Sequence, residues 1–200
     1  MSVLDPKAPG PGAAGAPAAG NNEERELKFS LEGIGLDPLR RRLEAAGARL
    51  ERQPSRECNW VFDRRDELFG SSRLLRLRSN GLGSRLTFKG PPRFEDGVKV
   101  RDEIEVAVGH AESTRDLLVR LGYRVVRRYE KVREEWSLGA TVVALDHTPI
   151  GDFVEFEGAE AAAAAERAGF VVADAERRSY LRLYEDWRRL HPELPPDMVF

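Results

Sequence analysis

The chain has 200 residues, the length of one domain with short appendages. Its 34 acidic and 32 basic residues give a formal net charge of −2, which argues against binding nucleic acid through a bulk basic excess. No apolar run reaches the roughly 18 residues of a membrane-spanning helix, and one cysteine with three scattered histidines does not make a zinc site. We therefore expect a cytoplasmic protein without a membrane or nucleic-acid partner.

The two ends of the chain differ in composition from the middle. Residues 1–22 are rich in Pro, Gly and Ala, so they bury too little apolar surface to offset chain entropy, and we expect a disordered tail. Prolines and glycines also interrupt any apolar stretch of a secretory signal there. Residues 23–190 are expected to form the folded domain, and residues 191–200 a Pro-rich tail or strap.

The sequence of the first half of the folded region predicts one helix and several strands. Asp37 followed by Pro38 is a helix start signal, with Asp37 as the N-cap and Pro38 in the first position. The apolar stripe of that helix consists of Leu39, Leu43, Ala46 and Leu50. Strands are expected at residues 24–29, 59–62, 74–79, 85–89 and 98–108. Asn80 and Gly81 are typical of a tight hairpin.

The second half predicts three more helices between short strands. A helix at about 113–121 would direct Leu117, Leu118 and Leu121 inward. An alanine run starts the next helix at Ala161, and the last covers about 175–190. In the last helix, a core-facing stripe is expected from Tyr180, Leu183, Tyr184 and Trp187. Strands are expected at residues 125–132, 134–138, 141–145 and 153–157. The whole pattern indicates an α+β fold dominated by an antiparallel sheet.

Charged residues recur at a spacing of two on several predicted strands, which places them on one face. For any single strand, an antiparallel sheet with one dry and one wet face explains this pattern. This explanation does not account for all of these strands together. Their positions at a spacing of two are nearly all fully charged, and acidic and basic pairs occur on different strands. A closed barrel with a charged, water-filled interior would bring such strands together, since inward and outward residues alternate in a barrel.

The chemistry of these residue types indicates a polyphosphate bound with its metal ion. Carboxylate oxygens suit Mg²⁺ or Mn²⁺, and Mg²⁺ is usually held by few carboxylates together with substrate phosphates. Arg and Lys at fixed positions suit phosphate oxygens. A Walker loop is absent, and Gly81-Leu82-Gly83 lacks the third glycine of a dinucleotide fingerprint.

The charged motifs occur in a fixed order along the chain. Glu24-x-Glu26-x-Lys28 stands at the start of the folded region. The later motifs are Arg76-x-Arg78, Thr87-Phe88-Lys89-Gly90, Arg101-x-Glu103-x-Glu105, Lys131-x-Arg133, Asp146, Gly151-x-Phe153-x-Glu155-x-Glu157 and Ser179-Tyr180-Leu181. This order, with the first motif as an ExExK signature, resembles that of the CYTH superfamily, the triphosphate tunnel metalloenzymes. The resemblance covers about residues 23–190, and the spacing from Arg101 to Glu157 is similar to that of the class IV adenylyl cyclase branch.

The resemblance implies a closed eight-stranded antiparallel β-barrel with a charged interior and flanking helices. It implies phosphate binding by Lys28, Arg76, Arg78, Lys89, Lys131 and Arg133. It implies Mg²⁺ or Mn²⁺ binding by Glu24, Glu26, Asp146, Glu155 and Glu157. Arg101 would join the phosphate site, and Glu103 and Glu105 would hold a second ion or orient the basic residues. A homodimer is compatible with this branch.

Three functions remain open at this point. The first is a metal-dependent adenylyl cyclase, in which the ribose 3′-hydroxyl of ATP attacks the α-phosphorus and pyrophosphate leaves. The second is hydrolysis of tripolyphosphate, thiamine triphosphate or a nucleoside triphosphate, which needs the same lining with the substrate placed differently along the tunnel. The third is a non-catalytic polyphosphate- or nucleotide-binding module, which would not need the metal carboxylates.

Overall fold

The computed structural model describes residues 23–81 and 83–200, so the tail expected at residues 1–22 lies outside the described residues. The described strands are β1 (Glu23–Ser30), β2 (Arg49–Asp63), β3 (Leu74–Ser79), β4 (Ser84–Lys89), β5 (Arg93–Glu95), β6 (Val98–Val108), β7 (Arg124–Leu138), β8 (Thr141–Thr148) and β9 (Gly151–Glu157). The α-helices are α1 (Leu36–Ala45), α2 (Ala111–Arg120), α3 (Ala161–Arg167) and α4 (Tyr180–Leu190). Two 3₁₀ turns are η1 (Phe69–Ser71) and η2 (Val172–Asp174).

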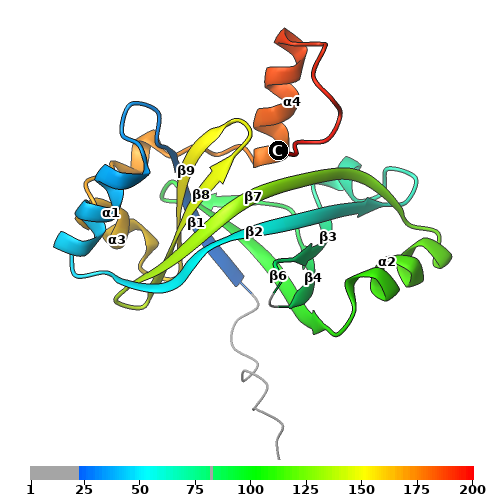
Figure 1. Cartoon of the computed structure of the whole chain (residues 1–200), viewed down its shortest axis with the longest axis horizontal. Coiled ribbons are helices and arrows are strands. Elements are labelled where there is room, and N and C mark those ends of the chain that lie inside the picture. The colour runs from blue at the N-terminus through cyan, green and yellow to red at the C-terminus, as the bar shows by residue number, and fades with distance from the viewer. Residues whose placement is uncertain (1–22, 82) are drawn as a thin grey trace, which may run out of the picture.

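Eight of the strands close into an antiparallel barrel, which confirms the predicted fold class. Their order is β1-β9-β8-β7-β2-β3-β4-β6, and β6 pairs with β1 to complete the ring. The three-residue strand β5, which the sequence pattern did not predict, adds to β6 as a short ninth strand. In Figure 1, α1 and α3 lie together on one side of the barrel, α2 lies on the other, and α4 lies at the top. Within the described ranges, no helix combines the length and apolarity needed to cross a membrane.

The longest strands, β2 and β7, differ most from the prediction. Each has 15 residues, and they pair along most of their length with register shifts near both ends of β2. The first half of β2 is polar and exposed, so its sequence lacks the alternation that signals a strand, and pairing with β7 supplies its structure. On β7, the strands expected at 125–132 and 134–138 form one continuous strand.

Helix α1 begins slightly earlier and ends earlier than expected. Gly35, not Asp37, is the N-cap, and Asp37 lies in the first turn, where its carboxylate accepts a hydrogen bond from Arg40 at 2.5 Å. Leu50 was expected on the helix stripe but belongs to β2, because α1 ends at Ala45. Leu39 and Leu43 do face inward, and both are fully buried.

Helices α2 and α4 also correct the prediction. Only Leu118 of α2 is buried, whereas Leu117 and Leu121 are exposed, because α2 presents a single narrow face to the barrel. Helix α4 starts at Tyr180 rather than near residue 175, where the Ser179 hydroxyl accepts a hydrogen bond from the backbone of the first turn. Of its predicted apolar stripe, Tyr180 and Tyr184 are buried and Trp187 is 38% exposed.

The segment 191–200 packs back along β7. The backbone N–H of Glu130 donates to the carbonyl of Met198 at 2.8 Å, and the Met198 side chain is fully buried. Met198 belongs to a cluster with Tyr129, Tyr180 and Tyr184. The end of the chain therefore helps to hold α4 against the barrel.

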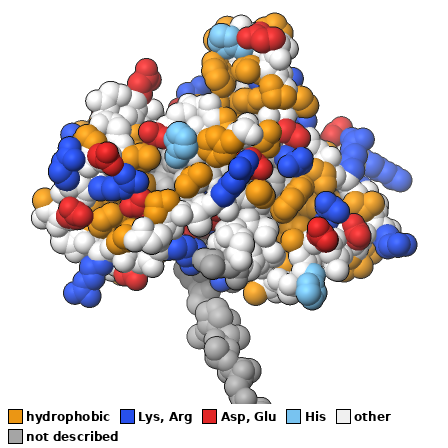
Figure 2. All heavy atoms as spheres, in the orientation of Figure 1, with side chains coloured by type: hydrophobic (Ala, Val, Ile, Leu, Met, Phe, Trp, Pro, Cys, Tyr) orange, Lys and Arg blue, Asp and Glu red, His pale blue; other side chains and the backbone are white. Residues whose placement is uncertain are grey.

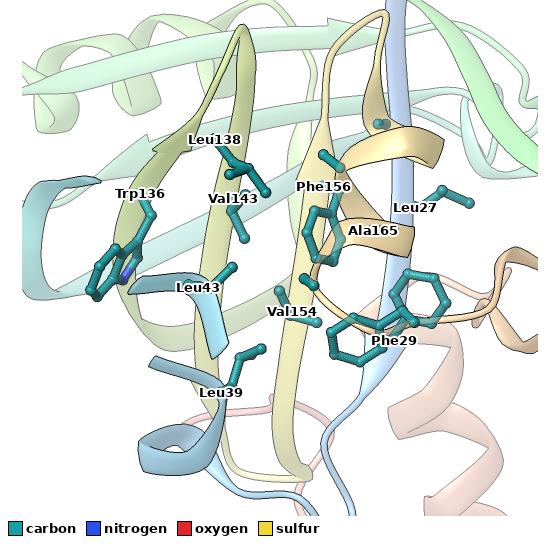
Figure 3. Close-up of a cluster of buried hydrophobic side chains, with 14 of the residues drawn as sticks. Leu27, Phe29, Leu39, Leu43, Trp136, Leu138, Val143, Val154, Phe156 and Ala165 are labelled. Atoms are coloured by element: carbon teal, nitrogen blue, oxygen red, sulfur yellow. The ribbon is translucent and has the colours of Figure 1, made fainter. Parts of the chain in front are cut away.

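The main hydrophobic core lies outside the barrel. It fills the space between β1, β7, β8 and β9 and the helices α1 and α3 (Figure 3). Phe29 and Phe156 from the strands meet Phe170, with the Phe29 and Phe170 ring centroids 4.7 Å apart. Because neighbouring residues point to opposite faces, the strands that bury these rings outside direct their charged residues into the barrel.

This arrangement predicts that stability depends on the outer core. Leu43→Ala should lower the free energy of unfolding by about 2–5 kcal/mol, since a fully buried leucine leaves a cavity. Denaturant unfolding measures the change. Leu117→Ala, at a position 57% exposed on α2, serves as the control and should change stability by less than about 0.5 kcal/mol. Equal losses in both variants would contradict the assignment of the core.

Candidate functional site

A cavity of about 530 Å³ occupies the interior of the barrel. The residues predicted from spacing-of-two motifs line it together: Glu24, Glu26, Lys28, Arg76, Arg78, Lys89, Arg101, Glu103, Glu105, Lys131, Arg133, Glu155 and Glu157. Asp146 is the one predicted site residue outside this lining, because it is fully buried behind the basic residues. By contrast, basic and acidic side chains are interspersed on the outer face in Figure 2.

Glu24 lies at the least neutralised part of the lining. One oxygen of its buried carboxylate pairs with Lys89, whose ammonium also lies 3.2 Å from Glu103, and the other oxygen has no hydrogen-bond partner. Burial, and then the charge of Glu26, raise the pKa of Glu24 to about 8. Lys89, which Glu24 shares with Glu103, therefore compensates the ionised carboxylate of Glu24 only in part.

Glu26 and Glu157 face each other across β1 and β9, where they are paired in the strand register. Burial opposes ionisation of Glu26, but the ammonium groups of Lys99, Lys89 and Lys28 together outweigh it and lower the pKa of Glu26 to about 2. Desolvation against the cavity wall raises the pKa of Glu157, although solvent still reaches its side chain, and no salt bridge to it is found within the described residues. Glu24 and Glu157 thus have too few cations beside them, whereas the charge of Glu26 is compensated.

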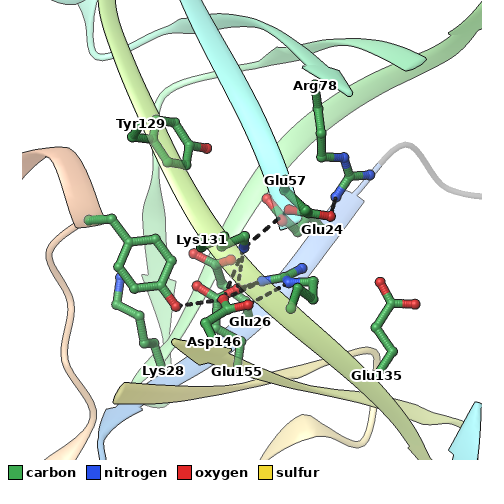
Figure 4. Close-up of polar contacts among 12 residues, drawn as sticks. Glu24, Glu26, Lys28, Glu57, Arg78, Tyr129, Lys131, Glu135, Asp146 and Glu155 are labelled. Atoms are coloured by element: carbon green, nitrogen blue, oxygen red, sulfur yellow. Dashed lines mark hydrogen bonds and ion pairs between the residues drawn. The ribbon is translucent and has the colours of Figure 1, made fainter. Parts of the chain in front are cut away.

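Asp146 holds the opposite wall together. It accepts hydrogen bonds from Lys131 at 2.9 Å, from two nitrogens of Arg133 at 2.6 and 2.7 Å, and from the hydroxyl of Tyr180 at 2.8 Å (Figure 4). Burial opposes ionisation, but Arg133 and Lys131 outweigh it and lower the pKa of Asp146. Arg133 also pairs with Glu155. Asp146 thus orients two cations and connects them to α4.

Two arginines on β3 supply a further cationic surface. Arg76 is buried, its nearest carboxylate oxygen on Glu105 is 4.0 Å away, and its Nε atom has no partner. It donates to the hydroxyl of Tyr129 at 3.2 Å. Arg78 lies 3.5 Å from Glu57 and 3.4 Å from Glu105. Arg76 therefore retains more uncompensated positive charge than Arg78.

Lys28 and Arg101 contact backbone carbonyls at the edges of the cavity. The Lys28 ammonium donates to the carbonyl of Arg178 and lies 4.4 Å from the ring centroid of Tyr180, and burial lowers its pKa. Arg101 donates to the carbonyls of Gly90 at 2.6 Å and Ser72 at 3.0 Å. These hydrogen bonds connect Arg101 to two loops. Its role as a phosphate ligand stays a prediction.

Sequence reasoning missed four residues whose side chains contact the predicted site residues. Lys99 and Tyr129 each lie two positions before a predicted residue, on β6 and β7, so extending the same alternation would have found them. Glu57 lies in the polar half of β2, where no strand pattern was visible. Tyr180 was assigned to the core, where its ring is indeed buried, and its hydroxyl also reaches Asp146.

The carboxylates that line the cavity are chemically suited to bind a divalent cation. Glu24, Glu26 and Glu157 offer hard carboxylate oxygens, and Glu24 has an unpartnered buried oxygen. Within residues 23–81 and 83–200, however, no group of three Asp, Glu, His or Cys side chains lies close enough together to hold a metal ion. Asp146 and Glu155 fit less well, because Lys131 and Arg133 both contact each of these carboxylates, whereas Glu24 and Glu26 each pair with a single lysine.

The raised pKa of Glu24 predicts a pH-dependent stability in the absence of divalent ions. The folded carboxyl releases its proton near pH 8 and the unfolded one near 4.5, so this group's stabilisation is complete below pH 4.5 and is lost as the pH rises through 8. The melting temperature in a chelator should fall over this interval, and less steeply in Glu24→Gln. An identical slope in Glu24→Gln would contradict the assignment, and the exposed Glu160→Gln is the control.

Comparison with known proteins gives a family-model match and several similar structures. A structure from Vibrio parahaemolyticus, described as a candidate adenylate cyclase, is 21% identical, with a TM-score of 0.71 over 81% of this chain and 97% of that one. A protein of Pyrococcus horikoshii is 25% identical, with a TM-score of 0.63 over 82% and 99%. A candidate adenylyl cyclase from Hippeastrum, described as having a dominant triphosphatase activity, is 16% identical, with a TM-score of 0.60 over 82% and 96%.

No curated protein sequence is significantly similar to this chain. The family model that matches is that of the CYTH domain, and it covers residues 22–181. This range includes every strand of the barrel and every residue predicted for its interior. The chain belongs to the CYTH domain family.

Proposed function

We propose that this protein is a divalent-metal-dependent enzyme that acts on a triphosphate compound inside the barrel, with the cyclisation of ATP to cyclic AMP and pyrophosphate as its first candidate reaction. The observation that carries the proposal is the incomplete pairing of opposite charges in one enclosed cavity. Arg76 lacks a close carboxylate, while Glu24 and Glu157 lack sufficient cations. A triphosphate with a divalent cation supplies both missing charges. Family membership and the structural neighbours support the same conclusion.

The basic residues would bind the phosphates and stabilise the leaving group. The guanidinium of Arg76 has no hydrogen-bond partner at Nε, and Lys131 and Arg133 are held in fixed positions by Asp146. Lys28, Arg78 and Lys89 are the remaining cations proposed for phosphate binding. Preorganised cations of this kind stabilise negative charge that develops on pyrophosphate as it leaves. Their second contribution is to hold the α-phosphorus in line with the ribose 3′-hydroxyl.

Glu24, Glu26 and Glu157 would hold Mg²⁺ or Mn²⁺, with Glu155 next to them. When bound, the ion would supply Lewis-acid polarisation of a phosphate oxygen and lower the pKa of the attacking hydroxyl. Glu103 would help by keeping Lys89, 3.2 Å away, beside the carboxylate of Glu24. Asp146 was grouped with the metal ligands in the sequence, and its hydrogen bonds support a positioning role instead.

Hydrolysis of a triphosphate is the second candidate. The same cations and carboxylates would serve it, with water in place of the 3′-hydroxyl. The dominant triphosphatase activity described for the Hippeastrum protein favours considering it for this chain. A non-catalytic polyphosphate-binding module ranks third, because all the proposed metal carboxylates are retained.

Product analysis by ³¹P NMR separates these functions. Protein is incubated with ATP and, separately, with tripolyphosphate, each with Mg²⁺ and with Mn²⁺. The proposal predicts a cyclic phosphodiester and pyrophosphate from ATP. Orthophosphate without a cyclic product would replace the cyclase with a triphosphatase. Unchanged substrates would leave the binding module as the remaining candidate.

Replacing one proposed metal ligand provides a direct test. Glu157→Gln should lower metal-dependent turnover by roughly 100-fold or more while far-UV circular dichroism stays unchanged, because the amide binds hard cations poorly. The exposed Glu166→Gln on α3 is a matched control with no expected effect. Full activity of Glu157→Gln at saturating Mg²⁺ would exclude Glu157 as a ligand.

The two roles considered for Asp146 lead to different kinetics. If it positions Lys131 and Arg133, Tyr180→Phe removes one hydrogen bond to a charged acceptor and should raise the KM for the triphosphate roughly tenfold. The Mg²⁺ concentration for half-maximal activity should stay the same. Asp146→Asn should act in the same direction and more strongly. A rise in the Mg²⁺ requirement with an unchanged KM would instead identify Asp146 as a metal ligand.

A further inference from the structure

A buried carboxylate and a buried amide lie beside the phosphate-binding cations and take no part in the proposed function. Glu57 and Asn59 stand two positions apart on the inner face of β2, and each residue is 1% exposed. Within the described residues, one oxygen of Glu57 and both polar atoms of the Asn59 side chain have no hydrogen-bond partner. Buried polar groups without partners are uncommon in folded proteins, so two of them side by side indicate groups that change their contacts.

Glu57 carries a negative charge among cations. Its carboxylate oxygens lie 3.5 Å from a guanidinium nitrogen of Arg78 and 3.8 Å from the ammonium of Lys131 (Figure 4). Burial opposes ionisation of Glu57, but Lys131, Arg133 and Arg78 together outweigh it and lower the pKa of this carboxyl. In the free protein, Glu57 therefore places negative charge beside cations that are proposed to bind phosphate.

Glu57 is not needed to hold these cations in position. Lys131 donates to Asp146 at 2.9 Å, and Arg78 also lies 3.4 Å from Glu105, so each cation keeps another anionic partner. The contacts of Glu57 itself, at 3.5 and 3.8 Å, are longer than the roughly 2.7–2.9 Å of a strong charge-assisted hydrogen bond. Glu57 thus contributes charge to this wall of the barrel more than it fixes geometry.

A free hydrogen-bond donor lies next to Glu57 on the same strand face. Asn59 pairs in the strand register with Arg78 on β3 and with Tyr129 on β7, whereas Glu57 pairs with Lys131. The amide nitrogen of Asn59 carries two donor hydrogens, and it has no acceptor in the part of the chain that the structure describes. A Glu57 carboxylate that turned from the cations to this amide would satisfy both side chains.

We propose that Glu57 is an internal counter-anion of the phosphate-binding cations, and that a bound polyphosphate displaces it from them toward Asn59. This role rests on the proposed function of the same cavity. Like charges repel strongly in a buried site, so the polyphosphate binds against the charge of Glu57. The same charge neutralises Lys131 and Arg78 before the ligand binds, and it favours release of the ligand when the carboxylate returns to them.

Calorimetric titration of tripolyphosphate with Mg²⁺ tests this role without depending on turnover. Glu57→Gln keeps the size of the side chain and removes its charge, so the Kd should fall roughly tenfold or more. If Glu57 served to position Lys131 and Arg78, the same substitution would raise the Kd. The exposed Glu51→Gln on the same strand is the matched control, and it should change the Kd less than about twofold.

Asn59→Ala tests where the displaced carboxylate goes. In otherwise wild-type protein it should raise the Kd roughly threefold or more, since the displaced Glu57 then lacks a donor. In the Glu57→Gln background it should change the Kd less than about twofold, because no charge is displaced there. Equal effects of Asn59→Ala in the two backgrounds would overturn the displacement toward Asn59.

The outcomes separate this role of Glu57 from the proposed function. If wild type binds tripolyphosphate and Glu57→Gln binds it equally well or more weakly, Glu57 is not a displaced counter-anion, and the proposed function stands. If wild type does not bind tripolyphosphate, the proposed function is wrong, and the role of Glu57 is wrong with it. If Glu57→Gln does not fold, Asn59→Ala decides alone, because a raised Kd supports the displacement and an unchanged Kd overturns it.

Discussion

The structure depends on the burial of many charges of both signs inside a closed barrel. Removing a charge from water is costly unless an opposite charge or hydrogen bonds compensate for it. Along one wall the compensation is complete, since Asp146 receives bonds from Lys131, Arg133 and Tyr180. Elsewhere it is not, as at Glu24, which keeps an unpartnered oxygen and a raised pKa. We propose that this imbalance is what would let the interior bind a cation together with a polyanion.

The barrel can carry this interior because its stability comes from the outside. Phe29, Phe156 and Phe170 pack between the strands and the covering helices, as do Leu39 and Leu43 of α1. Alternation along each strand separates the two tasks, with one side chain directed to the core and the next to the cavity. Substitutions in the cavity can therefore alter binding without removing the packing that holds the fold.

Much of the interior could be predicted because alternation is a local property of the sequence. Glu24, Glu26 and Lys28 were placed on one face by spacing, and the structure brings them into the cavity. Pairing across the barrel is not local, so the hydrogen bonds to Asp146 could not be predicted. The position of Glu57 beside the site could not be predicted either, because it lies on a strand whose polar sequence shows no alternation. The same limit applies to Leu117 and Leu121, whose helical spacing suggested burial although α2 covers the barrel only through Leu118.

The most direct test of the account is the melting temperature with Mg²⁺ alone, tripolyphosphate alone and both together. A ligand that binds only the folded state raises the melting temperature, and two ligands that complete each other's charge bind cooperatively. The account predicts a combined increase larger than the sum of the two separate increases. The absence of any increase, or two independent increases that simply add, would contradict the claim that the unpaired charges of this cavity await a cation and a polyanion together.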